Sequence, residues 1–422
     1  MRISTPQFYA ASLAGILNQQ NTLNTLSQQL STGNALVNPS DQPVAAAQNV
    51  TLTGQIDRLS TYTENGQGAQ NALQLESSTL QSVGTLVGQV RQLAVQMNNG
   101  TVGSQDLQNA ASAMQGYLQQ LVQYANTQDG QGNYIFAGSR SGTQPFAMQS
   151  DGSVHYLGDG GQNQLAIGAG LNTPIGDPGS ALFMNTPGGN GTFTVSASNG
   201  NSGSATAGPG NVVSAALAQQ TLLVAGTQYR ISFSGSAASG GTLTYSVTSG
   251  TGSGMAASGV VSSGAYVDGM SIGLPPGAAP AVTVPIQGTP AAGDGFTIAA
   301  ARPQSLFATF QALQQAFTSA AAQTSGSNAL RAQAIGNALS SLDRNQTTLL
   351  SAQAAIGTRL QQVQAVQTQN SSLTLQLQTQ QGQLTQINYA EVITGYQQSY
   401  TALQAAQKAF AQVQGMSLFQ YL

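Results

Sequence analysis

The chain has 422 residues, enough for two or three domains, yet only 5% of them are charged, against about a quarter in an average soluble protein. Ten basic and 13 acidic side chains give a net charge of −3, too few positive charges to neutralise a nucleic-acid backbone. The absence of cysteine excludes disulfides, thiolate metal ligands and thiol nucleophiles. Neutral polar residues must therefore provide most of the hydrated surface.

No targeting or membrane segment is evident. The N-terminal stretch MRISTPQFYAASLAGILNQQ contains Arg2 but lacks the apolar core of about 7 to 15 residues of a secretory signal peptide. Elsewhere Gln, Asn or Ser interrupts every apolar stretch before it reaches the roughly 18 residues that a membrane span needs. We expect a chain without a membrane span that is either soluble or exported without cleavage.

An amphipathic helix is predicted for the first segment, ending at Ser31-Thr32-Gly33. A second helix is expected after NPSDQP, where Ser40 or Asp41 can cap free N–H groups and Pro43 suits a first helical turn. The apolar residues of the first helix recur at helical spacing on one face: Leu13, Ile16, Leu23, Leu26 and Leu30.

Two further helices are predicted between residues 80 and 125. Apolar residues recur at intervals of three and four, the spacing of a coiled-coil seam. The two series are Leu80, Val83, Val87, Val90, Ala94 and Met97, then Leu107, Ala111, Met114, Leu118, Leu121 and Ala125. The short connection at Asn98 to Gly100 predicts that the two helices are antiparallel.

The middle of the chain changes to a period of two, which is typical of half-buried strands. Apolar and small polar residues alternate in Phe193–Ala197, Tyr229–Phe233, Leu243–Val247, Val282–Ile286 and Phe296–Ile298. Gly- and Ser-rich stretches separate these segments and are expected to be loops. A β-rich insertion is therefore predicted over residues 187–302.

Helix is predicted to return after Pro303, with the longest seam of the chain: Ile335, Leu339, Leu342, Leu349, Ile356, Leu360 and Val363. Gly336 and Gly357 each follow a seam isoleucine, so they point the same way. A glycine inside a helix costs up to about 1 kcal/mol relative to alanine. Their repeated placement predicts two points at which another backbone approaches closely, although simple tolerance explains them equally well.

The last segment carries a second apolar stripe and mirrors the first. Its members are Tyr389, Ile393, Tyr396, Tyr400, Leu403 and Phe410, followed by an apolar end that contains Leu418 and Phe419. Because a single-stripe helix is unstable alone in water, we expect the two ends to pair. The chain is predicted to be an α+β protein with long antiparallel coiled-coil-like helices formed by both ends and a mostly β domain inserted in the middle.

The sequence offers little for catalysis or for binding a metal or cofactor. His155 is the only histidine and alternates with its neighbours as a strand residue would. Asp151 and Asp159 stand beside glycines and are interpreted as turn formers rather than as a glycosidase pair. The stretch Asp129–Tyr134 begins like a calcium loop but has Tyr134 and Arg140 at the two discriminating positions. No catalytic, cofactor or metal site is predicted.

The stretch LSQQLSTGNALVNPSDQPVAAAQ at residues 26–48 resembles the N-terminal signature of flagellins and flagellar hook-associated proteins. Three further stretches, YTENGQGAQNAL, YANTQDGQGNYIFAGSRSGTQPF and LQAAQKAFAQVQGMSLFQYL, are similar to the hook-filament junction members of this family. The resemblance covers about residues 1–150 and 303–422. Gln42 departs from it, because a second acidic residue is usual there, as does the sequence at 386–388.

The resemblance implies a non-enzymatic subunit of an extracellular tube. Its paired ends, residues 1–42 and 384–422, would form the inner layer of the tube wall. A helical rod with a small β-hairpin region, residues 43–186 and 303–383, would lie outside them, and the insertion at 187–302 would face solvent.

The family also implies export through the flagellar type III apparatus with a cytoplasmic export chaperone. It further implies assembly with copies of itself, with hook-associated protein 1 and with flagellin. A filament flagellin is the nearest alternative, and a surface adhesin that binds through the insertion is a more distant one.

Overall fold

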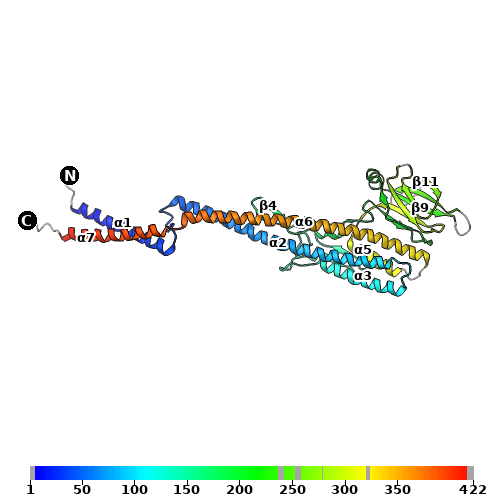
Figure 1. Cartoon of the computed structure of the whole chain (residues 1–422), viewed down its shortest axis with the longest axis horizontal. Coiled ribbons are helices and arrows are strands. Elements are labelled where there is room, and N and C mark those ends of the chain that lie inside the picture. Colours follow the sequence, from blue (N-terminus) through cyan, green and yellow to red (C-terminus); the bar gives the residue numbers. More distant parts are fainter. Residues whose placement is uncertain (1–4, 236–241, 252–257, 278, 320–323, 416–422) are drawn as a thin grey trace, which may run out of the picture. The chain divides into compact units, whose positions relative to one another are not determined.

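The computed structural model describes residues 5–235, 242–251, 258–277, 279–319 and 324–415 (Figure 1). Among the described helices, none is both long and apolar enough to cross a membrane. The helices are α1 (Thr5–Thr32), α2 (Pro43–Met97), α3 (Ser104–Ala125), α4 (Ala215–Ala218), α5 (Leu306–Thr318), α6 (Ser325–Thr385) and α7 (Tyr389–Gly415), with π-helical turns η1 (Ser180–Met184) and η2 (Gln219–Val224).

The strands lie between α3 and α5. They are β1 (Phe146–Met148), β2 (Val154–Tyr156), β3 (Gln164–Gly168), β4 (Leu171–Pro174), β5 (Thr186–Pro187), β6 (Phe193–Ala197), β7 (Thr206–Ala207), β8 (Asn211–Val212), β9 (Thr227–Ser234), β10 (Thr244–Thr251), β11 (Ser258–Ala265), β12 (Ser271–Leu274), β13 (Val282–Gln287), β14 (Gly295–Ala300) and β15 (Pro303–Gln304). The predicted α+β class, with helices from both ends and a mostly β middle, is confirmed.

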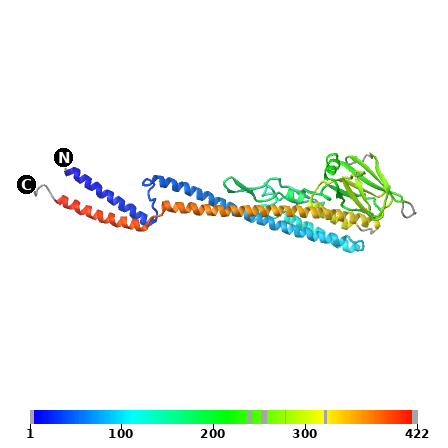
Figure 2. The same cartoon turned by 45° about the horizontal axis from the view of Figure 1, so that its top comes forward.

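The chain divides into two compact units. The first contains residues 1–66, 166–171 and 365–422, and the second contains residues 67–165 and 172–364. In the first unit, α1 and α7 lie side by side over most of their length (Figures 1 and 2).

Helix packing in the second unit follows the predicted seams. The seam residues of α2 and α3 are buried, among them Val83, Val87, Met114 and Leu121, and so are Ile335, Leu342, Leu349, Ile356 and Val363 of α6. Helix α5 packs against α3, which the sequence did not predict. It starts where the Ser305 hydroxyl accepts the N–H of Ala308 at 2.9 Å, an N-cap.

The expectation of a close backbone approach at Gly336 and Gly357 is wrong for contacts within the chain. No described atom lies within 4 Å of the position that a Cβ would take at either residue, once the helix's own neighbouring backbone is set aside. The seam isoleucines are buried, and the adjacent glycines are partly exposed. Both are glycines that the helix tolerates, and a side chain would meet no contact there.

The β-rich region of the second unit, which comprises β6 to β14, has two antiparallel sheets. The larger has the strand order β11-β10-β9-β14-β6, and the smaller has the order β12-β13-β7, with β8 also pairing with β13. The inward residues of the predicted period-two segments form one buried cluster, which includes Phe193, Ile231, Phe233, Val247, Val284, Phe296 and Ile298. The alternation predicted from the sequence is therefore confirmed by burial.

Helix α6 lies beside this β-rich region (Figure 2). It contacts the region through polar side chains spaced four residues apart in the sequence. Gln333 accepts the Ala207 N–H at 2.7 Å, and Asn337 donates to the Val195 carbonyl at 2.8 Å. Further along, Ser341 donates to Gln304 at 3.4 Å, and Asn345 accepts from Thr186 at 2.8 Å. We call Gln333, Asn337, Ser341 and Asn345 the polar ladder. It covers edge positions of β6 and β7 that would otherwise be open to other strands.

Candidate assembly interface

The paired terminal helices contact each other along their length in antiparallel order. The Tyr9 and Phe410 rings meet edge to face with centroids 6.0 Å apart. The Gln19 side-chain amide donates to the Ser399 carbonyl at 3.2 Å. Gly395 lies opposite Leu26, whose methyl group would be 3.8 Å from a Cβ at that position. Contacts that run from Tyr9–Phe410 to Leu26–Gly395 confirm that the helices from the two chain ends pair.

The structure distributes the predicted interface residues over two environments. Tyr396 and Leu403 of α7 are half-buried, as are Ile16, Leu23, Leu26, Leu30 and Phe410. Leu13, Ile393 and Tyr400 are 50%, 44% and 50% exposed. Leu418 and Phe419 lie outside the described residues. The apolar stripes are therefore wider than one helix pair can cover.

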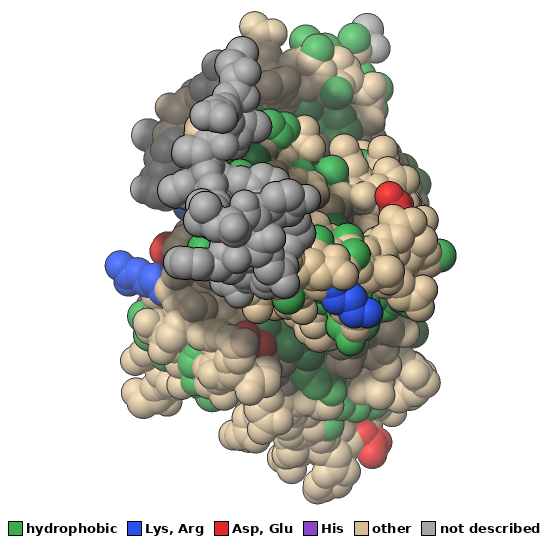
Figure 3. Space-filling view, turned by 90° about the vertical axis from the view of Figure 1, so that its left-hand side faces the viewer, with side chains coloured by type: hydrophobic (Ala, Val, Ile, Leu, Met, Phe, Trp, Pro, Cys, Tyr) green, Lys and Arg blue, Asp and Glu red, His purple; other side chains and the backbone are tan. Residues whose placement is uncertain are grey.

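Sequence reasoning missed part of this exposed apolar surface. Leu17 of α1 is 51% exposed and was not predicted to belong to an apolar stripe. Tyr389 of α7 is 56% exposed and was predicted to belong to one. A groove of about 410 Å³ also runs between α1 and α7, lined on the α7 side by Ala402, Ala406, Ala409 and Phe410. In Figure 3, charged side chains are isolated among neutral polar and hydrophobic ones.

The predicted break between the first two helices is present. Helix α1 ends at Thr32, and Gly33 takes a positive φ of 70°, which suits a helix C-terminus. Helix α2 starts at Pro43, the first-turn position expected for proline. Ser40 and Asp41 lie in the turn before it, where the Ser40 hydroxyl donates to the Asp41 carboxylate at 3.3 Å and Asn38 donates to the same carboxylate at 3.3 Å.

A second break, between α6 and α7, is joined to the first by backbone pairing that the sequence did not predict. The Ala35 N–H donates to the Thr385 carbonyl at 2.7 Å, and Asn34 pairs with Gln386 in an antiparallel bridge. The one available sequence signal was Asn388 followed three residues later by Glu391, a pattern that marks a helix start. Both helix breaks therefore meet at one backbone bridge.

The aspartates considered for chemistry serve to shape loops, and His155 lies in β2 opposite Ala147, as a strand residue. The Asp151 carboxylate accepts the N–H and hydroxyl of Ser153, and these bonds lower its pKa. Asp159 accepts the N–H groups of Ser139 and Gly161, which lower its pKa. Asp129 likewise accepts three bonds from its own loop. No cluster of three or more His, Asp or Glu side chains that could hold a metal ion occurs within the described ranges.

Comparison with known proteins shows what parts of this chain resemble. Residues 3–141 match the family model of the bacterial flagellin N-terminal helical region. Flagellar hook-associated protein 3 of Escherichia coli (strain K12) is 34% identical over 183 residues, which cover 43% of this chain and 57% of that protein. The match therefore spans little more than half the length of this curated relative.

Solved structures extend the match to most of the chain. Flagellar hook-associated protein 3 from Legionella pneumophila has a TM-score of 0.70 and 28% identity, covering 79% of this chain and 98% of its own. The flagellar junction protein FlgL from Legionella pneumophila has a TM-score of 0.68 and 27% identity, covering 80% of this chain and 99% of its own.

The N-terminal helical part of this chain is therefore similar to the corresponding region of bacterial flagellin. The resemblance to flagellar hook-associated protein 3 inferred from the sequence is confirmed in both sequence and fold.

Proposed function

We propose that this protein is a structural subunit of the bacterial flagellum that joins hook-associated protein 1 to the flagellin filament. It would do so by helical self-assembly through its terminal helices. The observation that carries the proposal is the apolar surface left open on the α1–α7 pair, where Leu13, Ile393 and Tyr400 are about half exposed. Large exposed apolar surfaces with neutral surroundings are typical of protein–protein contacts.

The assembly energy would come mainly from covering these side chains with neighbouring subunits. Full burial of one Leu, Ile or Phe contributes about 1.5 to 3 kcal/mol, of which ordering of the chain offsets a part. The large apolar side chains that remain exposed for this purpose are Leu13 and Leu17 on α1 and Tyr389, Ile393 and Tyr400 on α7. The resemblance to hook-associated protein 3 supplies the partners: copies of this chain, hook-associated protein 1 and flagellin.

Each proposed layer of the tube wall corresponds to particular residue ranges. Residues 1–42 and 384–422 form the inner layer, residues 43–186 and 303–383 form the rod around it, and residues 187–302 face solvent. The subunit reaches the hook-filament junction outside the cell by type III export, with help from a cytoplasmic chaperone. Its function is to fit between two related tubes.

Immunogold labelling of flagella with an antibody against residues 187–302 tests the proposal. Label in one band between hook and filament is the expected result. Label along the whole filament would instead identify a flagellin. Flagella without label would overturn the flagellar role and favour a surface adhesin, which binding of the isolated insertion to glycans would then support.

A further inference from the structure

A buried ionic cluster in the second unit joins α2, α6 and the segment between β4 and η1. Glu76 of α2 is completely buried, and its Oε1 accepts the backbone N–H of Asp177 at 2.9 Å. The Asp177 carboxylate receives two bonds from the Arg359 guanidinium of α6, at 2.9 and 3.1 Å. Gln162 donates a further bond to Asp177 at 2.7 Å. The segment at 175–179 is therefore tied to both helices at Asp177.

The charges of this cluster balance only if one carboxyl group is neutral. Arg359 forms a bidentate pair with Asp177, the stronger geometry for an ion pair. An ionised Glu76 would then be a second buried negative charge with no countercharge of its own, which is strongly unfavourable. The pKa of Glu76 is raised to about 8, chiefly by burial and secondly by the nearby Asp177 charge, while the Asp177 N–H and Arg359 act in the lowering direction.

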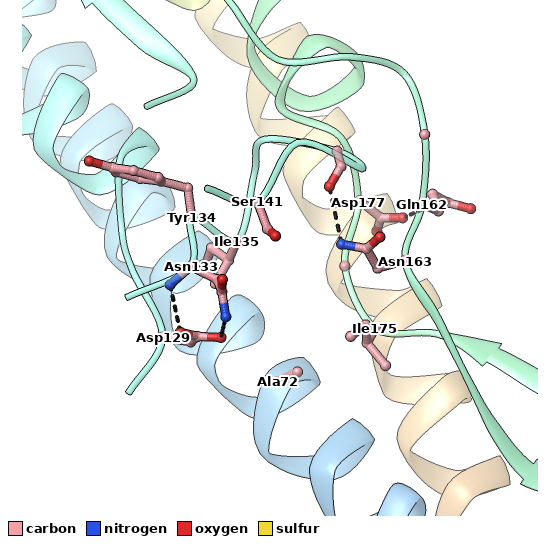
Figure 4. Close-up of a pocket in the computed structure, with 13 residues that line it drawn as sticks. Ala72, Asp129, Asn133, Tyr134, Ile135, Ser141, Gln162, Asn163, Ile175 and Asp177 are labelled. Carbon is pink, nitrogen blue, oxygen red and sulfur yellow. Dashed lines mark hydrogen bonds between the residues drawn. The ribbon is translucent and has the colours of Figure 1, made fainter. Parts of the chain in front are cut away.

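The tied segment closes one wall of a cavity and leads into an aromatic cluster. Ile175 and Asp177 line one side of a cavity of about 120 Å³, and Asp129 and Tyr134 line another (Figure 4). Two residues further, the Gly179 N–H donates to the Phe136 carbonyl at 2.9 Å. Phe136, Phe146, Phe183 and Phe307 then pack ring against ring with centroids 5.1 to 6.2 Å apart.

We propose that Glu76, Asp177 and Arg359 form a proton-dependent latch. With Glu76 protonated, the segment at 175–179 is held against α2; when Glu76 loses its proton, the segment separates from α2, opens the cavity and loosens the aromatic cluster. This inference concerns the rod alone and does not depend on where in the flagellum the subunit lies.

The direction of the pH effect follows from the pKa of Glu76. Its folded value of about 8 lies above the ordinary 4.5, so the folded chain binds the proton more tightly than the unfolded chain. The stability that Glu76 contributes is complete below about pH 4.5 and declines as the pH rises to 8. Above pH 8 Glu76 is ionised in the folded chain, and the latch opens.

The test compares the full chain with Glu76→Gln, in which the amide keeps the shape and neutrality of the protonated carboxyl. Glu64→Gln is the matched control, because Glu64 is an exposed glutamate on the same helix. Melting temperatures are measured from pH 6 to 9. We expect the melting temperature of the wild type and of Glu64→Gln to fall over this range and that of Glu76→Gln to stay nearly constant.

Hydrogen–deuterium exchange of residues 172–184, corrected for the intrinsic pH dependence, locates the effect. We expect exchange in the wild type to be about tenfold faster at pH 9 than at pH 7, and unchanged in Glu76→Gln. Identical pH profiles of wild type and Glu76→Gln would overturn the proposal. If Glu76→Gln does not fold, carbon-13 NMR of the wild-type Glu76 carboxyl decides, since a titration midpoint near 4.5 would overturn it.

Discussion

At the scale of single residues, the glycines of α6 make a direct prediction. Gly336→Ala should raise the free energy of unfolding by up to about 1 kcal/mol, because alanine favours helix and its Cβ meets no atom within 4 Å. Chemical denaturation of the unassembled subunit measures this change. Gly66→Ala is the comparison, since its Cβ would lie 3.0 Å from the Gln367 side chain, and we expect a smaller gain or a loss.

A loss of stability in Gly336→Ala similar to that in Gly66→Ala would contradict this account. A second informative outcome is a Gly336→Ala variant that is more stable than the wild type as a monomer but fails to assemble. It would indicate that the close backbone approach predicted from the sequence comes from a neighbouring subunit rather than from the same chain.

At the scale of secondary-structure elements, the α1–α7 pair carries two groups of apolar residues. We expect the half-buried residues to stabilise the subunit and the exposed residues to join subunits. Leu26→Ala removes a half-buried side chain between the helices, and we expect a loss of about 1 to 2 kcal/mol from their pairing. Leu13→Ala removes a side chain that is 50% exposed, and we expect less than about 0.5 kcal/mol. Circular dichroism during denaturation measures both.

If Leu13 lies at a subunit interface, its substitution should affect polymerisation strongly although it affects the stability of the monomer little. We expect Leu13→Ala to slow assembly, as followed by light scattering, although its monomer is nearly as stable as the wild type. Normal assembly of Leu13→Ala, Ile393→Ala and Tyr400→Ala would show that the exposed face of the pair is not the assembly surface.

The elements themselves were largely predictable, because each depends on a local pattern. Intervals of three and four identified the seams of α2, α3 and α6, and alternation identified β6, β9, β10, β13 and β14. What joins these elements was not predictable. The Ala35–Thr385 bond and the polar ladder link residues far apart in the chain through backbone atoms or amide side chains, and such groups produce no periodic signal.

The candidate interface shows the same limit. Helical spacing identified the stripe, yet it could not separate Leu26, which is covered by α7, from Leu13, which is not. That difference depends on the angle at which two helices meet, and a single helix carries no information about its partner. Spacing likewise placed Gly336 beside the seam without showing what lies opposite.

At the scale of the whole molecule, the scarcity of charge makes a prediction about ionic strength. Only 5% of the residues are charged, so subunit contacts should consist of apolar packing and neutral hydrogen bonds, which salt screens little. We expect the critical concentration for assembly to change less than about threefold between 50 mM and 500 mM sodium chloride. Sedimentation of assembled subunits measures it, and a tenfold change would show that charge pairs dominate.

The polar ladder has a consequence for how this protein can change during evolution. Two of its four contacts are made to main-chain atoms: the N–H of Ala207, which every residue type except proline provides, and the carbonyl of Val195, which every residue type provides. Substitutions at these two positions, and over the outer surface of the β-rich region, therefore leave half of the attachment to α6 intact. A region anchored in this way is free to drift in sequence while the helices beside it keep theirs.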